Sequence, residues 1–396
     1  MVELLKEIFS GVIHLFSVAG VKNIIMFIIS FVLIYLAIKK EYEPNLLLPI
    51  GFGAILANLP PLVNGFAAVL GTVEEPGFLK VLYNAGIINE LFPILIFIGI
   101  GAMCDFTPLM KNPIMMFFGA AAQFGIFATF LLALVVLPVI GVEGDVLVKL
   151  AASIGIIGAA DGPTTLYAAN YFQLGKYMGP ITVAAYSYMA LVPIIQPPVI
   201  KLLTTKEERR IRMDYHEEYV SKGALIVFPV IITVVAGILV PMSAPLIGSL
   251  MFGNLLRVCG VLNHLSNTAQ NELANIVTIL LGLSVGSTMT GEDFLQVTTL
   301  MIMGLGLAAF IFDTAGGVLF AKFINLFRKK KINPMIGAAG ISAFPMSARV
   351  IQKMATAEDP TNFVLMQAIS ANVSGQLGSI VAGSVLIQLI SQLLGM

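Results

Sequence analysis

The chain has 396 residues, of which 58% are hydrophobic and 11% are charged, and its mean hydropathy is +0.95. These values lie far outside the range of soluble globular domains and place the chain in a lipid bilayer. A net charge of zero leaves no basic surface for nucleic acid. The two cysteines and three scattered histidines favour neither a disulfide framework nor a zinc site.

The first 20 residues mix Glu3, Lys6 and Glu7 with apolar residues, which predicts an N-terminal amphipathic helix at the membrane interface over residues 1–20. Long stretches without Asp, Glu, Lys or Arg follow, at residues 23–38, 44–73, 112–142, 177–200, 223–256, 294–312 and 361–396. Since a spanning helix needs roughly 20 apolar residues, we expect about ten or eleven crossings, some of them interrupted. The predicted class is an all-α polytopic membrane protein.

Charged residues concentrate in the middle of the chain. Residues 201–222 hold six Lys or Arg and five Asp or Glu, which predicts one charged cytoplasmic loop. This loop divides a first membrane half, residues 21–200, from a second half, residues 223–396. Basic clusters at residues 39–40 and 328–331 should lie on the same side of the membrane by the positive-inside rule.

The two halves share a weak internal repeat of small residues and proline. At a constant offset of 182 residues, the positions Gly155, Gly158 and Pro163 recur as Gly337, Gly340 and Pro345. Because proline removes an N–H and disfavours helix before it, we expect helix breaks at 158–163 and 337–345. Freed backbone groups in a bilayer need protein, water or an ion as partners. Paired breaks indicate a transporter site near the midplane, although chance matches or simple packing kinks are the alternative.

Polar residues beside the breaks favour a binding site over packing kinks. A carboxylate at mid-membrane costs about 2.5 to 3.5 kcal/mol, so Asp161 indicates an ion or proton site. Hydroxyls at Thr164 and Thr165 would supply the oxygen ligands that hard cations prefer. A second intramembrane acid, Asp313, is either another cation ligand or a partner of helix ends and hydroxyls. In the second half, polar side chains include Asn333, Ser342, Ser347, Arg349, Ser370, Asn372, Ser374, Gln376 and Ser379.

Arg349 and two tyrosines each leave two interpretations open. Arg349 falls in the first turn after the second break, where a cation is poorly placed against the helix dipole. It therefore calls for an anion, either Asp161 or a substrate carboxylate held bidentately, unless the side chain reaches lipid headgroups instead. Tyr186 and Tyr188 are either interfacial anchors or phenols that ligate a cation or donate a proton.

Five stretches together resemble a known family, the membrane β subunits of sodium-transporting biotin-dependent decarboxylases. They read "LLLPIGFGAILANLP", "GAADGPTTLYAA", "ITVAAYSYMALVP", "GAAGISAFPMSARV" and "SANVSGQLGSIVAG". Family members serve oxaloacetate, methylmalonyl-CoA, glutaconyl-CoA or malonate complexes. The resemblance runs over nearly the whole chain and implies an inverted-repeat fold with broken helices, assembled as a homotrimer in a prokaryotic inner membrane. It also implies two partners, a carboxyltransferase or biotin-carrying subunit and a small membrane subunit.

The resemblance implies that this subunit decarboxylates carboxybiotin and exports sodium ions while consuming an external proton. It assigns sodium contacts to Asp161, Asn333, Gly337, Ser342 and Asn372, carboxybiotin contacts to Ser342 and Arg349, and catalytic roles to Tyr186, Tyr188 and Arg349. Lys111 in "LMKNP" lacks the setting of a biotin acceptor, so we expect biotin to arrive on another subunit. The alternative function is a sodium/proton antiporter or a sodium-coupled organic anion transporter without decarboxylation.

Overall fold

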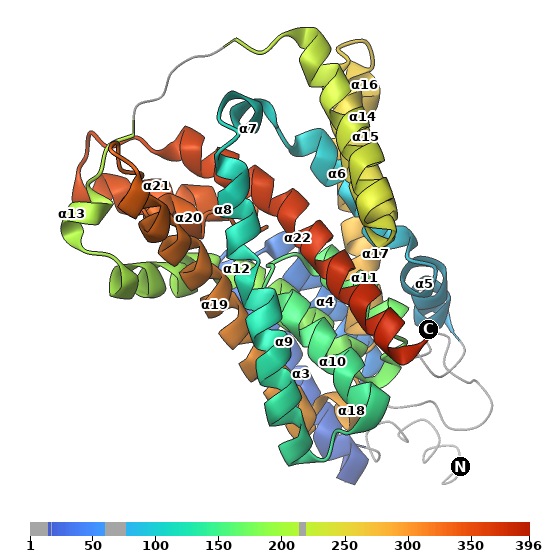
Figure 1. Ribbon diagram of the computed structural model, residues 1–396. Helices are drawn as coiled ribbons and strands as arrows, with labels where there is room; N and C mark the ends of the chain where they lie inside the picture. The colour runs from blue at the N-terminus through green and yellow to red at the C-terminus, as the bar shows by residue number, and fades with distance from the viewer. Residues whose placement is uncertain (1–14, 17, 60–76, 214–218) are drawn as a thin grey trace, which may run out of the picture.

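A computed structural model describes residues 15–16, 18–59, 77–213 and 219–396 as helices joined by short turns, with no strand in these ranges (Figure 1). Most of the expected interfacial helix over residues 1–20 lies outside the described residues. The first-half helices are α3 (Val18–Lys39), α4 (Pro44–Ala57), α5 (Phe78–Tyr83), η1 (Asn84–Ile88), α6 (Leu91–Met103), α7 (Thr107–Lys111), α8 (Met115–Ala122), α9 (Phe124–Val136), η2 (Leu137–Ile140), α10 (Gly144–Ile157), α11 (Gly162–Tyr171), α12 (Gly175–Leu203) and α13 (Lys206–Arg209). The second-half helices are α14 (Lys222–Leu239), η3 (Pro241–Ser243), α15 (Ala244–Val258), α16 (Asn263–Thr268), η4 (Ala269–Leu273), α17 (Ala274–Gly286), α18 (Gly291–Phe294), α19 (Val297–Phe327), α20 (Met335–Ala338), α21 (Met346–Glu358) and α22 (Leu365–Leu394).

The helices confirm an all-α polytopic membrane protein. Among the described residues, five helical stretches are long and apolar enough to cross a membrane, and the number rises to seven if two bent pairs each count as one span. The ten or eleven expected crossings are therefore not all single helices. The sequence estimate counted apolar runs, and several of these runs form helices too short to span alone, such as the 14 residues of α4 and of α10.

Prolines account for part of this interruption. In α12 the axis bends by 67° between Met189 and Leu191. Pro193 lacks the N–H that would bond to the carbonyl of Met189, and its ring would collide with that carbonyl in a straight helix. The bend separates the stretch that carries the two tyrosines from the stretch that runs toward the central charged segment.

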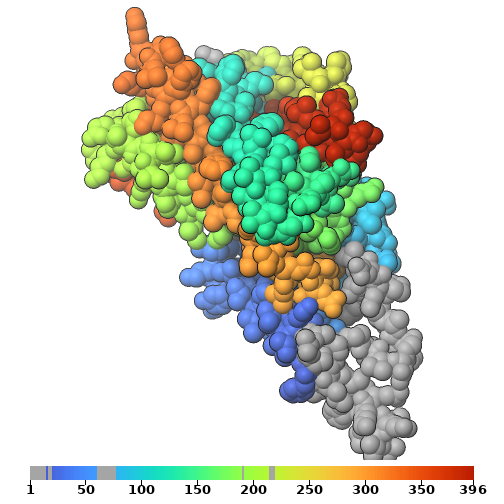
Figure 2. Space-filling model, turned by 60° about the horizontal axis from the view of Figure 1, so that its bottom comes forward, coloured from blue at the N-terminus to red at the C-terminus, as the bar shows by residue number. Residues whose placement is uncertain are grey.

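The helices form two packed groups. In one group α6 packs on α15, and α4 lies between α3 and α17; in the other α8, α9, α10 and α12 pack on α19, and α22 packs on α8 and α10. Figure 2 shows the face on which α9 and α19 lie side by side, while α3 extends beyond them at one end. Helices α6 and α15 approach so closely that a Cβ at Gly253 would collide with the carbonyl oxygen of Ile98.

The central charged segment is partly helical. Helix α12 continues to Leu203, and α13 follows with a capping box in which Thr205 and Glu208 each bond to the other's backbone N–H. The second half begins with α14 at Lys222. The inverted symmetry of the two halves stays a prediction.

Candidate functional site

The first half is interrupted between α10 and α11. Helix α10 ends at Ile157, residues 158–161 are not helical, and Ala160 has a left-handed φ of 54°. Helix α11 then begins with Gly162 and Pro163, which suits the first turn because proline has no N–H to leave unpaired. Asp161 is the N-cap residue of α11, so its carboxylate sits at the positive end of the helix dipole.

Three hydrogen bonds converge on the Asp161 carboxylate, which is only 3% exposed. The N–H of Thr164 donates to Oδ1 over 3.2 Å, and the Thr164 hydroxyl donates to Oδ2 over 2.7 Å. The Ser379 hydroxyl of α22 donates to the same Oδ2 over 2.9 Å. The carboxylate is thus surrounded by hydroxyl oxygens from both halves of the chain.

The second break lies directly against the first. Residues 339–345, between α20 and α21, are not helical. The N–H of Ser342 donates to the carbonyl of Ala159 over 3.0 Å, and the Ser342 hydroxyl lies 2.7 Å from the Ser379 hydroxyl. Asn372 donates to the carbonyl of Ile341 over 2.6 Å, and its own Oδ1 has no hydrogen-bond partner among the described residues. The breaks therefore meet through their main chains.

A cavity of about 60 Å³ opens where the two breaks meet. Its lining combines the polar groups of the breaks with apolar side chains of α6 and α12, namely Ile100, Met103, Ala160, Asp161, Pro163, Met189, Ser342, Phe344 and Gln376. In the described part of the chain, no three His, Cys, Asp or Glu side chains lie together as a metal cluster. A cation here would rest on one carboxylate and on neutral hydroxyl, amide and carbonyl oxygens, a set that suits a monovalent hard ion.

The structure separates the two tyrosines. The Tyr186 ring packs so tightly on Gly162 that a Cβ there would overlap it, and its buried hydroxyl, near the Asp161 carboxylate, has no hydrogen-bond partner among the described residues. The Tyr188 hydroxyl instead donates to the carbonyl of Met303 in α19 over 2.5 Å. Of the two tyrosines, Tyr186 is the one that packs against the first break.

Three residues expected at the site lie apart from Asp161. Gly337 packs against the backbone of Gly317 in α19, so closely that a Cβ on either would collide with the other's carbonyl. The Asn333 side chain is engaged at both ends, donating to backbone carbonyls of the central segment and accepting from Met335 N–H. Arg349 is exposed on α21, and the ion pairs formed among the described residues do not include it.

Asp313 is fully buried in the middle of α19. Neither carboxylate oxygen has a hydrogen-bond partner of standard geometry in the described ranges, although the amides of Gly125 and Ile126, in the first turn of α9, face it. A Cβ at Gly158 would lie 2.8 Å from Oδ2. Asp313 thus lies at a helix N-terminus, next to the first break and outside the lining of the cavity.

Sequence reasoning grouped Ser379 and Gln376 with the other polar residues of the second half and did not assign them a role. Ser379 bonds to Asp161, and the Gln376 amide donates to the carbonyl of Ser342. Gln196 was missed altogether. It donates to the carbonyl of Ala338 over 2.9 Å and accepts from the hydroxyl of Ser347, and a lone amide among the prolines of α12 was the available signal.

Comparison with known proteins decides the family. The family model described as Na+-transporting oxaloacetate decarboxylase beta subunit matches residues 22–390. The chain belongs to this family of β subunits. It is 49% identical to the methylmalonyl-CoA decarboxylase subunit beta of Propionigenium modestum, over 93% of this chain and 94% of that protein. It is 44% identical to the oxaloacetate decarboxylase beta chain of Klebsiella pneumoniae, over 96% of both chains.

The β-subunit family and the apolar helices agree on the general role of this chain. It is a membrane-embedded subunit of a multi-subunit sodium-transporting decarboxylase, and it crosses the bacterial inner membrane several times. Such a β subunit requires partner subunits. Relatives named for two different acids are similarly close, so the family alone does not select the acid.

Proposed function

We propose that this β subunit decarboxylates carboxybiotin presented by a partner subunit and couples the reaction to sodium export and to consumption of an external proton. The observation that carries the proposal is the buried Asp161 carboxylate at the meeting point of two helix breaks. One acid in an otherwise neutral oxygen cage can hold either a sodium ion or a proton, and this exclusivity is what an exchanger needs.

The sodium ion would bind to Asp161 with oxygens that the two breaks bring together. The hydroxyls of Thr164, Ser342 and Ser379 lie within one connected hydrogen-bond chain that ends on the carboxylate. Asn372 Oδ1 has no hydrogen-bond partner among the described residues, and Nδ2 of the same side chain donates to the carbonyl of Ile341, so this oxygen is a further neutral group near the second break. In this arrangement Asn333 and Gly337 support the second break without contacting the ion.

The reaction consumes one proton. The bond between the carboxylate carbon and the ureido nitrogen of carboxybiotin breaks, carbon dioxide leaves, and the nitrogen keeps the electron pair and takes the proton. The Tyr186 hydroxyl, beside Asp161 and without a fixed partner among the described residues, would pass that proton. The external proton would bind Asp161 first, where it would weaken cation binding and release sodium on the outer side, and Tyr186 would then relay this same proton to the nitrogen.

Arg349 would receive the carboxylate of carboxybiotin. It is exposed on α21, just after the second break, and it forms none of the ion pairs found in the described ranges. A guanidinium can hold a carboxylate by two parallel hydrogen bonds, which a single ammonium cannot do. The partner subunits would select the acid, and a trimer of β subunits in contact with a small membrane subunit would form the membrane part.

Replacement of Asp161 tests the proposal. We expect Asp161→Asn, reconstituted with its partner subunits in vesicles, to reduce sodium-22 uptake roughly tenfold or more, since hydrogen bonds and contacts of a charged group contribute about 1.5 to 3 kcal/mol. Moving one charge against 100 mV requires about 2.3 kcal/mol, which decarboxylation must supply. A site that lets ions leak back would therefore also lose the coupling between decarboxylation and sodium transport. Transport at the parental rate would show that Asp161 is not the ion site.

A further inference from the structure

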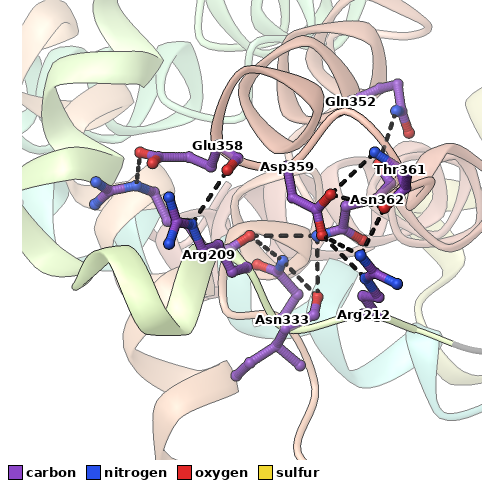
Figure 3. Close-up of polar contacts among 10 residues, drawn as sticks. Arg209, Arg212, Asn333, Gln352, Glu358, Asp359, Thr361 and Asn362 are labelled. Carbon is purple, nitrogen blue, oxygen red and sulfur yellow. Dashed lines mark hydrogen bonds and ion pairs between the residues drawn. The ribbon is translucent and has the colours of Figure 1, made fainter.

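The charged segment between the two halves is fastened to the second half by two asparagine amides. Asn333 Nδ2 donates to the main-chain oxygens of Arg209 and Ile211 over 2.8 and 2.9 Å. Asn362 Nδ2 donates to the same two oxygens over 3.4 and 3.3 Å, as Figure 3 shows. We name residues 204–213 the clamp segment. Two amides from separate parts of the second half therefore bond to one short stretch of the clamp-segment backbone.

Two arginines of the clamp segment add side-chain contacts to the second half. Arg209 is only 6% exposed, and its Nε lies 2.7 Å from Glu358 Oε1. Arg212 donates to Asp359 Oδ2 over 2.8 Å and to the Thr361 hydroxyl over 2.6 Å (Figure 3). Because a buried guanidinium is costly without its partner, the Arg209 contact fixes where the clamp segment lies.

These contacts fall at the two ends of the hairpin that carries the second break. Residues 333–359 form this second-break hairpin: Asn333 accepts from Met335 N–H at the start of α20, and Glu358 is the last residue of α21. Ser342, which lies against the first break, is between these two ends. The clamp segment is thus bonded to the hairpin where it begins and where it ends.

We propose that Asn333 is a positioning residue: together with Asn362 it fastens the clamp segment across both ends of the second-break hairpin, and it does not ligate sodium. The hairpin is then held in a fixed place, which keeps Ser342 against Ala159 and the breaks in register. Both polar atoms of Asn333 already have backbone partners, so the side chain is directed at the clamp segment and at the start of α20. This inference deepens the proposed function by separating the residues that bind the ion from those that hold the site.

The difference between an amide and a carboxylate separates the two roles. An aspartate at position 333 has the shape of asparagine and is a better ligand for a cation, but it cannot donate to a carbonyl. Beside two carbonyl oxygens it would be repelled. Asn333→Asp should therefore release the clamp segment, whereas a sodium ligand at this position would keep or strengthen ion binding after the same change.

Limited trypsin digestion of the full-length chain in detergent measures the clamp directly, because Arg209, Arg210 and Arg212 are cleavage sites within it. We expect Asn333→Asp and the matched Asn362→Asp each to accelerate cleavage there several-fold relative to the parental chain. In the reconstituted complex, both variants should lower the maximal rate of sodium-dependent decarboxylation and leave the half-saturating sodium concentration unchanged. Asn333→Ala and Asn362→Ala should act in the same direction.

The opposite results overturn the inference. Unchanged cleavage in Asn362→Asp, which lies outside the proposed ion site, would show that the amides do not hold the segment. A several-fold rise in the half-saturating sodium concentration for Asn333→Ala, absent in Asn362→Ala, would make Asn333 a sodium ligand. The digestion needs no transport, so a failure of the Asp161 assignment leaves this comparison intact.

Discussion

Two of the three hydrogen bonds to the Asp161 carboxylate come from hydroxyls, which can rotate. A hydroxyl that donates to the carboxylate in the absence of a cation can rotate and present its oxygen lone pairs when a cation enters. Thr164 and Ser379 donate to Asp161 in this way, and Ser342 contacts Ser379 behind them. If Asp161 binds sodium as proposed, loading and emptying the site would require rotations of these hydroxyls and no movement of charged partners.

Tyr186 and Tyr188 should respond differently to loss of the hydroxyl. We expect Tyr186→Phe to reduce sodium-dependent decarboxylation roughly tenfold or more, because general acid–base groups contribute about 10²- to 10⁴-fold. Tyr188→Phe removes one hydrogen bond to Met303 and should lower stability by about 1 kcal/mol while retaining most turnover. Steady-state rates and thermal unfolding of the two variants check this. An inactive Tyr188→Phe beside an active Tyr186→Phe would reverse the assignment.

Sequence patterns predicted Asp161 and the two helix breaks, but they could not show which polar side chains contact Asp161. The Gly-Pro pair after Asp161 predicted interrupted helix, and α11 does begin at Gly162. The choice of Ser379 over Ser374 depends on the rotation of α22, because Ser374 faces the carbonyl of Met115 in α8. The polar residues spaced along α22 give no such information without the neighbouring helix.

The second-break hairpin shows how short helices are stabilised in this fold. Helix α20 has four residues, too few to be stable alone, since isolated helices shorter than roughly 12 residues are marginal. Gln196 of α12 bonds to the carbonyl of Ala338 at its end, and Asn333 caps its beginning. The position of Ser342 thus depends on the Gln196 amide of α12 and on the Asn372 and Gln376 amides of α22, and composition alone could not reveal these long-range bonds.

The clamp segment should be held over a wide pH range. Hydrogen bonds from Thr361 and Arg212 lower the pKa of Asp359 from 3.8 to about 2, and those from Arg209 lower the pKa of Glu358. Groups with a depressed pKa stabilise the folded form above their ordinary pKa and lose that effect as pH falls through the lowered value. We expect hydrogen-exchange protection of the clamp segment, corrected for intrinsic rates, to stay level down to a pH of about 4. It should then decline toward a pH of about 2, and a decline already at neutral pH would contradict this.

The two halves of the molecule contact each other where the two helix breaks meet. Residues of the break between α10 and α11, of the break between α20 and α21 and of α22 contribute to one small region, so an ion bound there would contact both halves at once. The composition predicted the all-α membrane class, and the structure confirms it. The number of crossings was less accessible, because a proline or glycine decides whether an apolar run forms one helix or two.

Sodium should therefore stabilise the entire chain. A ligand at 100 times its dissociation constant stabilises the form that binds it by about 2.7 kcal/mol. We expect the thermal unfolding midpoint in detergent to rise as NaCl replaces KCl at constant ionic strength, with no rise for Asp161→Asn. Equal midpoints in the two salts for the parental chain would argue against a sodium site in this state.

The volume of the cavity limits what can bind beside Asp161. The cavity of about 60 Å³ is far smaller than the roughly 300 Å³ at which pockets for organic ligands begin. An ion with one water fits beside Asp161, and the fused rings of biotin do not. If carboxybiotin is the substrate, its carboxylate is lost outside this chamber, near the exposed Arg349. On the proposed function, the ion site beside Asp161 and the carboxylate site at the exposed Arg349 would therefore be distinct places in one protein.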